Sequence, residues 1–156
     1  MTEKVDAWKQ RGNVYLWRYQ ENCKNFPGWH LAADRAGAES LLILLAEFKS
    51  STASVYRTIT LSKPTINVLA VPNNKGGKAR WWAPSRFRIN FDPSPEAMSL
   101  WSFPVDQDPA VLFVGREFLL RLEAGIVDLS QGKGDYSIGG VTKEELSEQT
   151  SLWFWW

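Results

Sequence analysis

The segment Ser85-Arg86-Phe87-Arg88-Ile89-Asn90-Phe91 alternates between two kinds of side chain. In an extended chain, Phe87, Ile89 and Phe91 fall on one side, whereas Arg86, Arg88 and Asn90 fall on the other. A period of two is typical of a β-strand that has one face buried and the other in solvent. We therefore predict a strand over residues 85–91 whose outward face is cationic.

This strand lies at the end of a one-sided block of charge. The segment from Phe48 to Phe91 contains eight Lys and Arg residues and no Asp or Glu, whereas residues 92–156 contain eleven acidic and four basic residues. The net charge of the whole chain is only +1, so this total conceals an uneven distribution. A block of this kind attracts an acidic or anionic partner without specifying the chemistry of that partner.

Length and composition indicate a globular protein. The 156 residues fit one domain, residues 1–156, and 44% hydrophobic with 22% charged residues is ordinary for a chain that buries a core. Nine Trp, eight Phe and four Tyr residues make the chain rich in aromatic side chains. Aromatic residues bury large areas and are enriched at contact surfaces, so their number favours a binding face.

The sequence also indicates a cellular setting. Cys23 is the only cysteine, so no intramolecular disulfide can form, and the first residues lack the basic and then apolar order of a secretory signal. The longest apolar run, Leu41–Ala46, is far shorter than the roughly 20 residues that a membrane span needs. We expect a cytoplasmic protein without a membrane segment.

The first half of the chain predicts two strands and a helix. Residues Val14–Tyr19 alternate as a strand does, Trp29–Ala33 is a plausible partner strand, and Asp34 is a reasonable N-cap for a helix that ends near Phe48. The apolar residues of this helix follow helical spacing and form one stripe. They are Ala38, Leu41, Leu42, Leu45 and Phe48.

The second half predicts further strands and a second helix. We expect strands over Val55–Leu61, Met98–Phe103 and Tyr136–Ile138, an apolar segment over Thr65–Val71, and a loop tip at Gly76-Gly77. The region from Pro109 to Leu129 is mostly helical in pattern, although Val111–Val114 before Gly115 also fits a short strand. Gly125 fits a helix stop.

The chain closes on Leu152-Trp153-Phe154-Trp155-Trp156, which is apolar on both alternating faces. Such a strand is covered on both sides, either inside a sheet or at a homodimer contact. Strands outnumber helices and mostly follow one another directly. We therefore predict an α+β fold, with an antiparallel or mixed sheet and two main helices packed on it.

Catalytic and metal-binding motifs are scarce. His30 is the only histidine, and with one His and one Cys in the chain we predict no metal site and no cofactor. A catalytic pair of Cys23 and His30 requires only that they meet in space. A hydrogen-bonded strand histidine and a small buried thiol are the more common arrangement. Neighbouring carboxylates such as Asp106 and Asp108 fit a solvated surface.

The loop Asn73-Asn74-Lys75-Gly76-Gly77-Lys78 lacks the nucleotide-binding pattern of spaced glycines followed by Lys and Ser or Thr. It fits a solvated hairpin tip, or a concavity of backbone N–H groups that accepts an anion.

Cations and aromatic residues interleave from this loop into the alternating strand. Single-stranded nucleic-acid binders use this combination, and so do protein surfaces that bind acidic partners. Alternatively, the tryptophans pack within the domain and the acidic C-terminal third neutralises the cations. The candidate binding residues are Lys75, Lys78, Arg80, Trp81, Trp82, Arg86 and Arg88.

These observations favour a non-enzymatic cytoplasmic binding protein that docks an acidic protein surface on a basic aromatic face. An inhibitor or immunity-type protein suits the size and the lack of catalytic motifs. The alternative is a nucleic-acid or nucleotide binder that uses the same face. An enzyme built around His30 and Cys23 is the least supported hypothesis.

Overall fold

The computed structural model describes residues 2–20, 28–71, 79–105, 107–139 and 151–155. Two long helices, α2 and α4, accompany two β-sheets, which confirms the predicted α+β class with two main helices. The elements are α1 (Thr2–Ala7), β1 (Val14–Tyr19), β2 (Trp29–Ala33), α2 (Arg35–Lys49), β3 (Val55–Thr60), α3 (Ile66–Leu69), β4 (Trp81–Trp82), β5 (Arg86–Phe91), η2 (Pro95–Ala97), β6 (Trp101–Ser102), β7 (Ala110–Val114), α4 (Arg116–Ser130), β8 (Tyr136–Ile138) and β9 (Leu152–Phe154).

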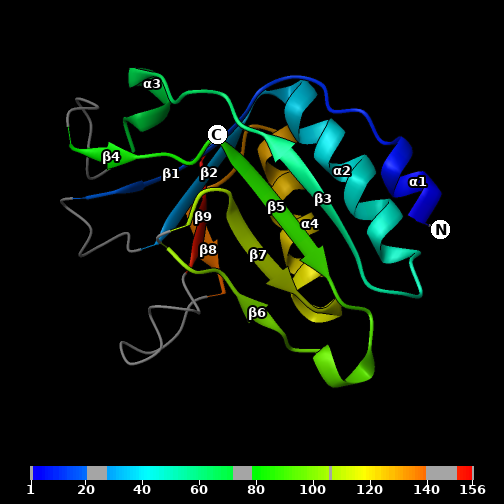
Figure 1. Cartoon of the computed structure of the whole chain (residues 1–156). Helices are drawn as coiled ribbons and strands as arrows, with labels where there is room; N and C mark the ends of the chain where they lie inside the picture. The colour runs from blue at the N-terminus through cyan, green and yellow to red at the C-terminus, as the bar shows by residue number, and fades with distance from the viewer. Residues whose placement is uncertain (1, 21–27, 72–78, 106, 140–150, 156) are drawn as a thin grey trace.

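The strands divide into two sheets where the sequence predicted one. The first has the order β4-β1-β2-β9-β8 and the second has the order β3-β5-β7-β6 (Figure 1). Both are mixed, since β2 pairs with β9 and β5 pairs with β7 in parallel, while the other neighbours are antiparallel. The second sheet is formed by β3, β5, β7 and β6 alone, whereas β4, β8 and β9 join β1 and β2 in the first sheet.

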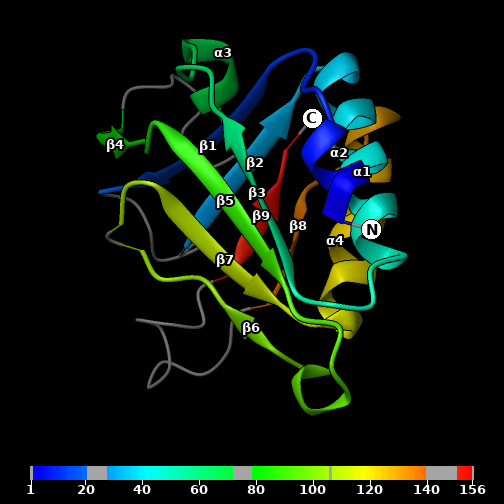
Figure 2. The ribbon, with the colours of Figure 1, turned by 45° about the vertical axis from the view of Figure 1, so that its right-hand side comes forward.

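One large hydrophobic core is enclosed by the two sheets and by α2 and α4. The inward side chains of β5 and β7 are almost fully buried there, together with Leu41 and Leu45 of α2 and Leu119 and Leu122 of α4. Figures 1 and 2 show the long helices on the inner side of the four-stranded sheet, with no described helix over its other face. That sheet therefore has one buried face and one open face.

The start of α2 confirms the predicted cap at Asp34. Its carboxylate accepts hydrogen bonds from the backbone N–H of Gly37 at 2.7 Å and of Asn13 at 2.9 Å, and from the Asn13 side chain. Burial alone would raise the pKa of Asp34, but these hydrogen bonds hold it below the ordinary value of 3.8. The cap therefore joins the beginning of α2 to the residue before β1.

The alternation of β1 is also confirmed. Val14 and Leu16 enter the large core, whereas Trp17 and Tyr19 enter a second cluster on the opposite face of the five-stranded sheet. This second cluster is completed by Val68 and Leu69 of α3 with Val71 after it, by segment 79–83 and by the C-terminal segment. Both faces of the central strands in this sheet are therefore covered.

The C-terminal aromatic segment lies inside this sheet, the first of the two predicted arrangements. β9 pairs with β2 on one side and with β8 on the other. Leu152 and Phe154 are buried in the large core, whereas Trp153 and Trp155 join the second cluster. Trp156 lies outside the described residues, and a homodimer contact stays a prediction.

One predicted strand needs correction, and two segments that the sequence left open take a definite structure. The strand expected over Met98–Phe103 is reduced to β6, because Pro95 begins the short helix η2 and the chain turns again as Leu100 N–H donates to Ala97. The apolar segment Thr65–Val71 contains the one-turn helix α3, since the Thr65 side chain accepts from Val68 N–H as an N-cap. In the region of Pro109–Leu129, the first residues form β7, as the strand alternative proposed.

Gly125 is not a helix stop. It lies within α4, where a Cβ atom would overlap the ring of Phe154. The absence of a side chain therefore lets α4 approach β9 closely. None of the helices in the described ranges is long and apolar enough to cross a membrane.

Candidate binding face

The strand β5 presents the cationic face that its sequence predicted. Phe87, Ile89 and Phe91 are each 1% exposed and point into the core, so Arg86 and Arg88 project from the other side of the sheet. The start of β5 is fixed because Ser85 donates to Asp108 Oδ1 from its backbone N–H at 3.0 Å and from its hydroxyl at 2.9 Å. The strand thus holds its two arginines at fixed positions of a rigid sheet.

Neighbouring strands complete this surface through their register. Thr58 pairs with Arg88 on one side, and Val111 pairs with it on the other, so their side chains share a face. We call this surface the open face. It consists of Tyr56, Thr58 and Thr60 of β3, Arg86, Arg88 and Asn90 of β5, Val111 and Phe113 of β7, and Ser102 of β6.

The open face combines cations with exposed aromatic rings. The guanidinium carbon of Arg88 lies 3.7 Å from the centre of the Tyr56 ring, which is a cation–π contact. The exposed fraction of Tyr56 is 55%, and that of Phe113 is 43%. Exposed aromatic side chains on the same face as arginine are typical of surfaces that bind another macromolecule.

The charges of the open face are not neutralised within the described residues. The open-face residues of β3, β5, β6 and β7 include two arginines, Arg86 and Arg88, and no acidic residue. Arg86 and Arg88 form no ion pair with any residue in the described ranges, and Arg88 Nε has no hydrogen-bond acceptor there. By contrast, Lys49 of the same basic block pairs with Glu123 of α4 at 2.9 Å. Intramolecular neutralisation by the acidic C-terminal third therefore applies to Lys49 but not to the arginines of β5.

The two tryptophans predicted to share this surface lie elsewhere. β4 pairs with β1, and its two side chains point to opposite faces of the five-stranded sheet. Trp81 packs against the second cluster, whereas Trp82 packs against the large core with its ring centre 5.9 Å from that of Trp29. Both rings are partly buried, so they contribute to packing within the domain and do not form one stacking platform.

Of the remaining predicted residues, the described ranges contain only Arg80. Arg80 is exposed just before β4. Lys75, Lys78 and the loop tip at Gly76-Gly77 lie outside the described residues. The structure therefore brings together Arg86 and Arg88 from the predicted set and adds Tyr56 and Phe113 to them.

His30 is a buried, hydrogen-bonded strand histidine, as the sequence favoured. Its ring is fully buried and stacks between Trp17, at 5.5 Å between ring centres, and Trp155, at 6.1 Å. The Nε1–H group of Trp155 donates to His30 Nδ1 at 2.8 Å. This arrangement ties β2 to the chain end, while Cys23 lies outside the described residues.

The part of the chain that the structure describes contains no arranged set of metal ligands. No group of three or more His, Cys, Asp or Glu side chains is placed there to hold an ion. The Tyr136 hydroxyl donates a hydrogen bond of 2.8 Å to the carboxylate of Asp128. Burial of the Tyr136 side chain, together with the hydrogen bond to Asp128 and its negative charge, raises the pKa of Tyr136 to about 12. This pair closes the turn between α4 and β8.

Tyr56 and Phe113 were missed because their role depends on pairing across strands. The strand predicted over Val55–Leu61 contains Tyr56, but the sequence did not indicate which strand would lie next to it. Phe113 belongs to a segment for which helix and strand were both open.

Comparison of the whole chain with known proteins finds no matching family model, no matching curated protein and no matching solved structure.

Proposed function

We propose that this is a non-enzymatic binding protein that docks an acidic surface of a protein partner on the open face. The observation that carries the proposal is the pair Arg86 and Arg88, which project from an uncovered sheet face without an ion pair in the described residues. More specifically, we propose that it acts in the cytoplasm as an inhibitor or immunity-type protein.

The chemistry of the open face supports a protein partner. Arg and Tyr are the residue types that contribute most binding energy at protein interfaces, and charge complementarity accelerates the encounter of two surfaces. The contact with Tyr56 orders the Arg88 side chain before binding, which lowers the entropy lost when a carboxylate docks on it.

A nucleic-acid partner is less favoured by the same geometry. Proteins that bind single strands stack successive bases on aromatic side chains that line one groove. Here Arg88 occupies one face of the Tyr56 ring, and Trp81 and Trp82 point to opposite faces of another sheet. The described surface therefore lacks the aromatic platform that this function needs.

Binding to defined polyanions tests the proposal. We would compare a fluorescent glutamate-rich peptide with a fluorescent single-stranded oligodeoxynucleotide, using the wild type and the variant Arg86→Glu/Arg88→Glu. The matched control is Arg35→Glu/Arg121→Glu, which makes the same change in net charge on exposed helix positions.

We expect the β5 variant to bind the peptide at least roughly tenfold more weakly, a change of about 1.4 kcal/mol, and the helix variant to bind it as the wild type does. Equal weakening in both variants would show that only net charge matters. Tighter binding of the oligodeoxynucleotide, with a log–log salt slope of about −0.7 per neutralised phosphate, would favour the nucleic-acid alternative.

A further inference from the structure

The edge of the four-stranded sheet carries a second feature, the free side of β3. In an antiparallel pair, the N–H and C=O groups of one residue point to the same side, and this side alternates along the strand. The N–H of Thr60 donates to the side-chain oxygen of Gln10 at 2.8 Å, and the side-chain nitrogen of Gln10 donates to the Thr60 carbonyl at 2.7 Å. The backbone groups of Thr60 therefore point away from β5, and the side-chain amide of Gln10 forms with them the two hydrogen bonds that a neighbouring strand would form.

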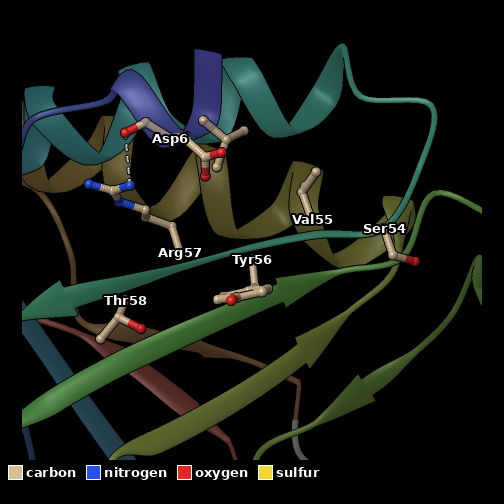
Figure 3. A pocket seen from close by; sticks show the side chains of 7 residues that line it. Asp6, Ser54, Val55, Tyr56, Arg57 and Thr58 are labelled. Carbon is tan, nitrogen blue, oxygen red and sulfur yellow. Dashed lines mark hydrogen bonds between the residues drawn. The ribbon is translucent and has the colours of Figure 1, made fainter. Parts of the chain in front are cut away.

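The same alternation applies to Tyr56 and Thr58. Their backbone N–H and C=O groups point to the free side of β3, where they form no hydrogen bond with any residue in the described ranges. A groove of about 580 Å³ runs along this side, between α1 and β3 (Figure 3). Unpaired edge groups beside an open groove are the feature that an added strand uses.

The two sides of this groove have different chemistry. Arg57 turns toward α1 and donates to the carbonyls of Asp6 and Trp8, both at 3.0 Å, and the Asp6 side chain lines the same wall. Tyr56 lies on the opposite side of β3 under the guanidinium of Arg88 (Figure 3 shows Arg57 and Tyr56 on the two sides). An acidic side chain is therefore favoured on the open face, whereas the charges of Arg57 and Asp6 offset each other beside α1 and favour an uncharged side chain there.

We propose that the partner contributes an extended segment that pairs with β3 at Tyr56 and Thr58, with acidic side chains on the open face and uncharged side chains toward α1. This inference rests on the proposed function and names the part of the partner that the open face receives. Side chains of a strand alternate between its faces, so the recognised segment alternates acidic and apolar residues. Gln10 closes the edge at Thr60 and limits the pairing to a short segment.

The probe is an acetylated and amidated hexapeptide of alternating glutamate and valine. Amide hydrogen exchange of the wild-type protein, measured with and without this peptide, tests the pairing without any substitution. We expect the amides of Tyr56 and Thr58 to exchange at least about tenfold more slowly with the peptide, because they become hydrogen-bonded. The amides of Arg57 and Ile59, which already face β5, serve as internal references.

Substitution of Thr58 gives a second readout. Thr58→Pro removes an N–H that points away from β5, and Thr58→Val is the matched control that keeps it. We expect Thr58→Pro to bind the peptide roughly threefold to tenfold more weakly than Thr58→Val does. Unchanged exchange of the Tyr56 and Thr58 amides in the presence of bound peptide would overturn the inference, even if the proline variant does not fold.

A hexapeptide with lysine in place of glutamate separates this inference from the proposed function. If that peptide binds as tightly and still protects Tyr56 and Thr58, the edge pairs strands but the preference for acidic partners is wrong. If the glutamate peptide binds without protecting these amides and its binding is lost in Arg86→Glu/Arg88→Glu, the open face binds acid but no strand is added to β3.

Discussion

Substitutions at Phe154 and Gly125 test how the C-terminal strand is packed into the core. Phe154 is fully buried, lies 5.3 Å from Tyr136 between ring centres, and occupies the space that a Cβ atom at Gly125 would need. Phe154→Ala should lower the free energy of unfolding by about 3 to 5 kcal/mol, which is a large part of the roughly 5 to 15 kcal/mol of a typical domain. Gly125→Ala alone should destabilise by up to about 2 kcal/mol, because overpacking outweighs the better helix propensity of alanine.

The two substitutions should be strongly coupled. Once Phe154→Ala has removed the ring, Gly125→Ala no longer meets it and should stabilise the protein by about 1 kcal/mol through helix propensity. Urea denaturation of the four proteins in this cycle, followed by far-ultraviolet circular dichroism, measures the coupling. The control is Phe113→Ala, the same substitution at an exposed site, which we expect to change stability by no more than about 0.5 kcal/mol. If Gly125→Ala has the same effect in both backgrounds, α4 does not pack on β9 as described.

Three further predictions concern buried and titrating groups. His30→Ala should lower the free energy of unfolding by about 2 to 5 kcal/mol, because it opens a cavity and leaves Trp155 Nε1 without its acceptor. A His30→Ala protein that is as stable in urea as the wild type would contradict the stacked arrangement. Since the pKa of Asp34 lies below 3.8 in the folded protein, its charged form stabilises the fold at neutral pH, and this contribution is lost as the pH falls through that lowered pKa. Asp34→Asn should therefore show a shallower loss of stability in acid, and an unchanged pH profile would argue against the cap. The neutral Tyr136 phenol stabilises the fold below its ordinary pKa of 10.0, and this contribution is lost as the pH rises through about 12. In Asp128→Asn, ultraviolet titration should show a lower pKa for Tyr136 than in the wild type. An unchanged pKa would mean that Asp128 is not the cause of the shift.

Local patterns were sufficient to predict the elements that depend on local contacts. The strand alternation of β1 and β5, the apolar stripe of α2 and the hydrogen bond from Gly37 to the cap at Asp34 each involve neighbours within a few residues. The short helix η2 was missed although Ser94-Pro95 is a common helix start, because the apolar residues after it also fit a strand. Local pattern could not decide between these two structures.

Pairing between distant segments could not be predicted in the same way. His30 and Trp155 are separated by 125 positions and still form one hydrogen bond, and the parallel pairing of β2 with β9 leaves no local signal. The burial of both faces of β9 followed from its composition, but its partners did not. The candidate site shows the same limit, since alternation within β5 gave Arg86 and Arg88, while Tyr56 became part of the surface only through the register of β3.

Affinity capture from the cells that produce the protein tests the central claim most directly. The immobilised wild type, Arg86→Glu/Arg88→Glu and the control Arg35→Glu/Arg121→Glu would be exposed to the same lysate, and the retained proteins compared quantitatively. The proposed function predicts that the wild type and the helix control retain the same acidic protein and that the β5 variant, folded and equally stable, loses it. Equal retention of that protein by the β5 variant would contradict the assignment of the open face as the binding surface.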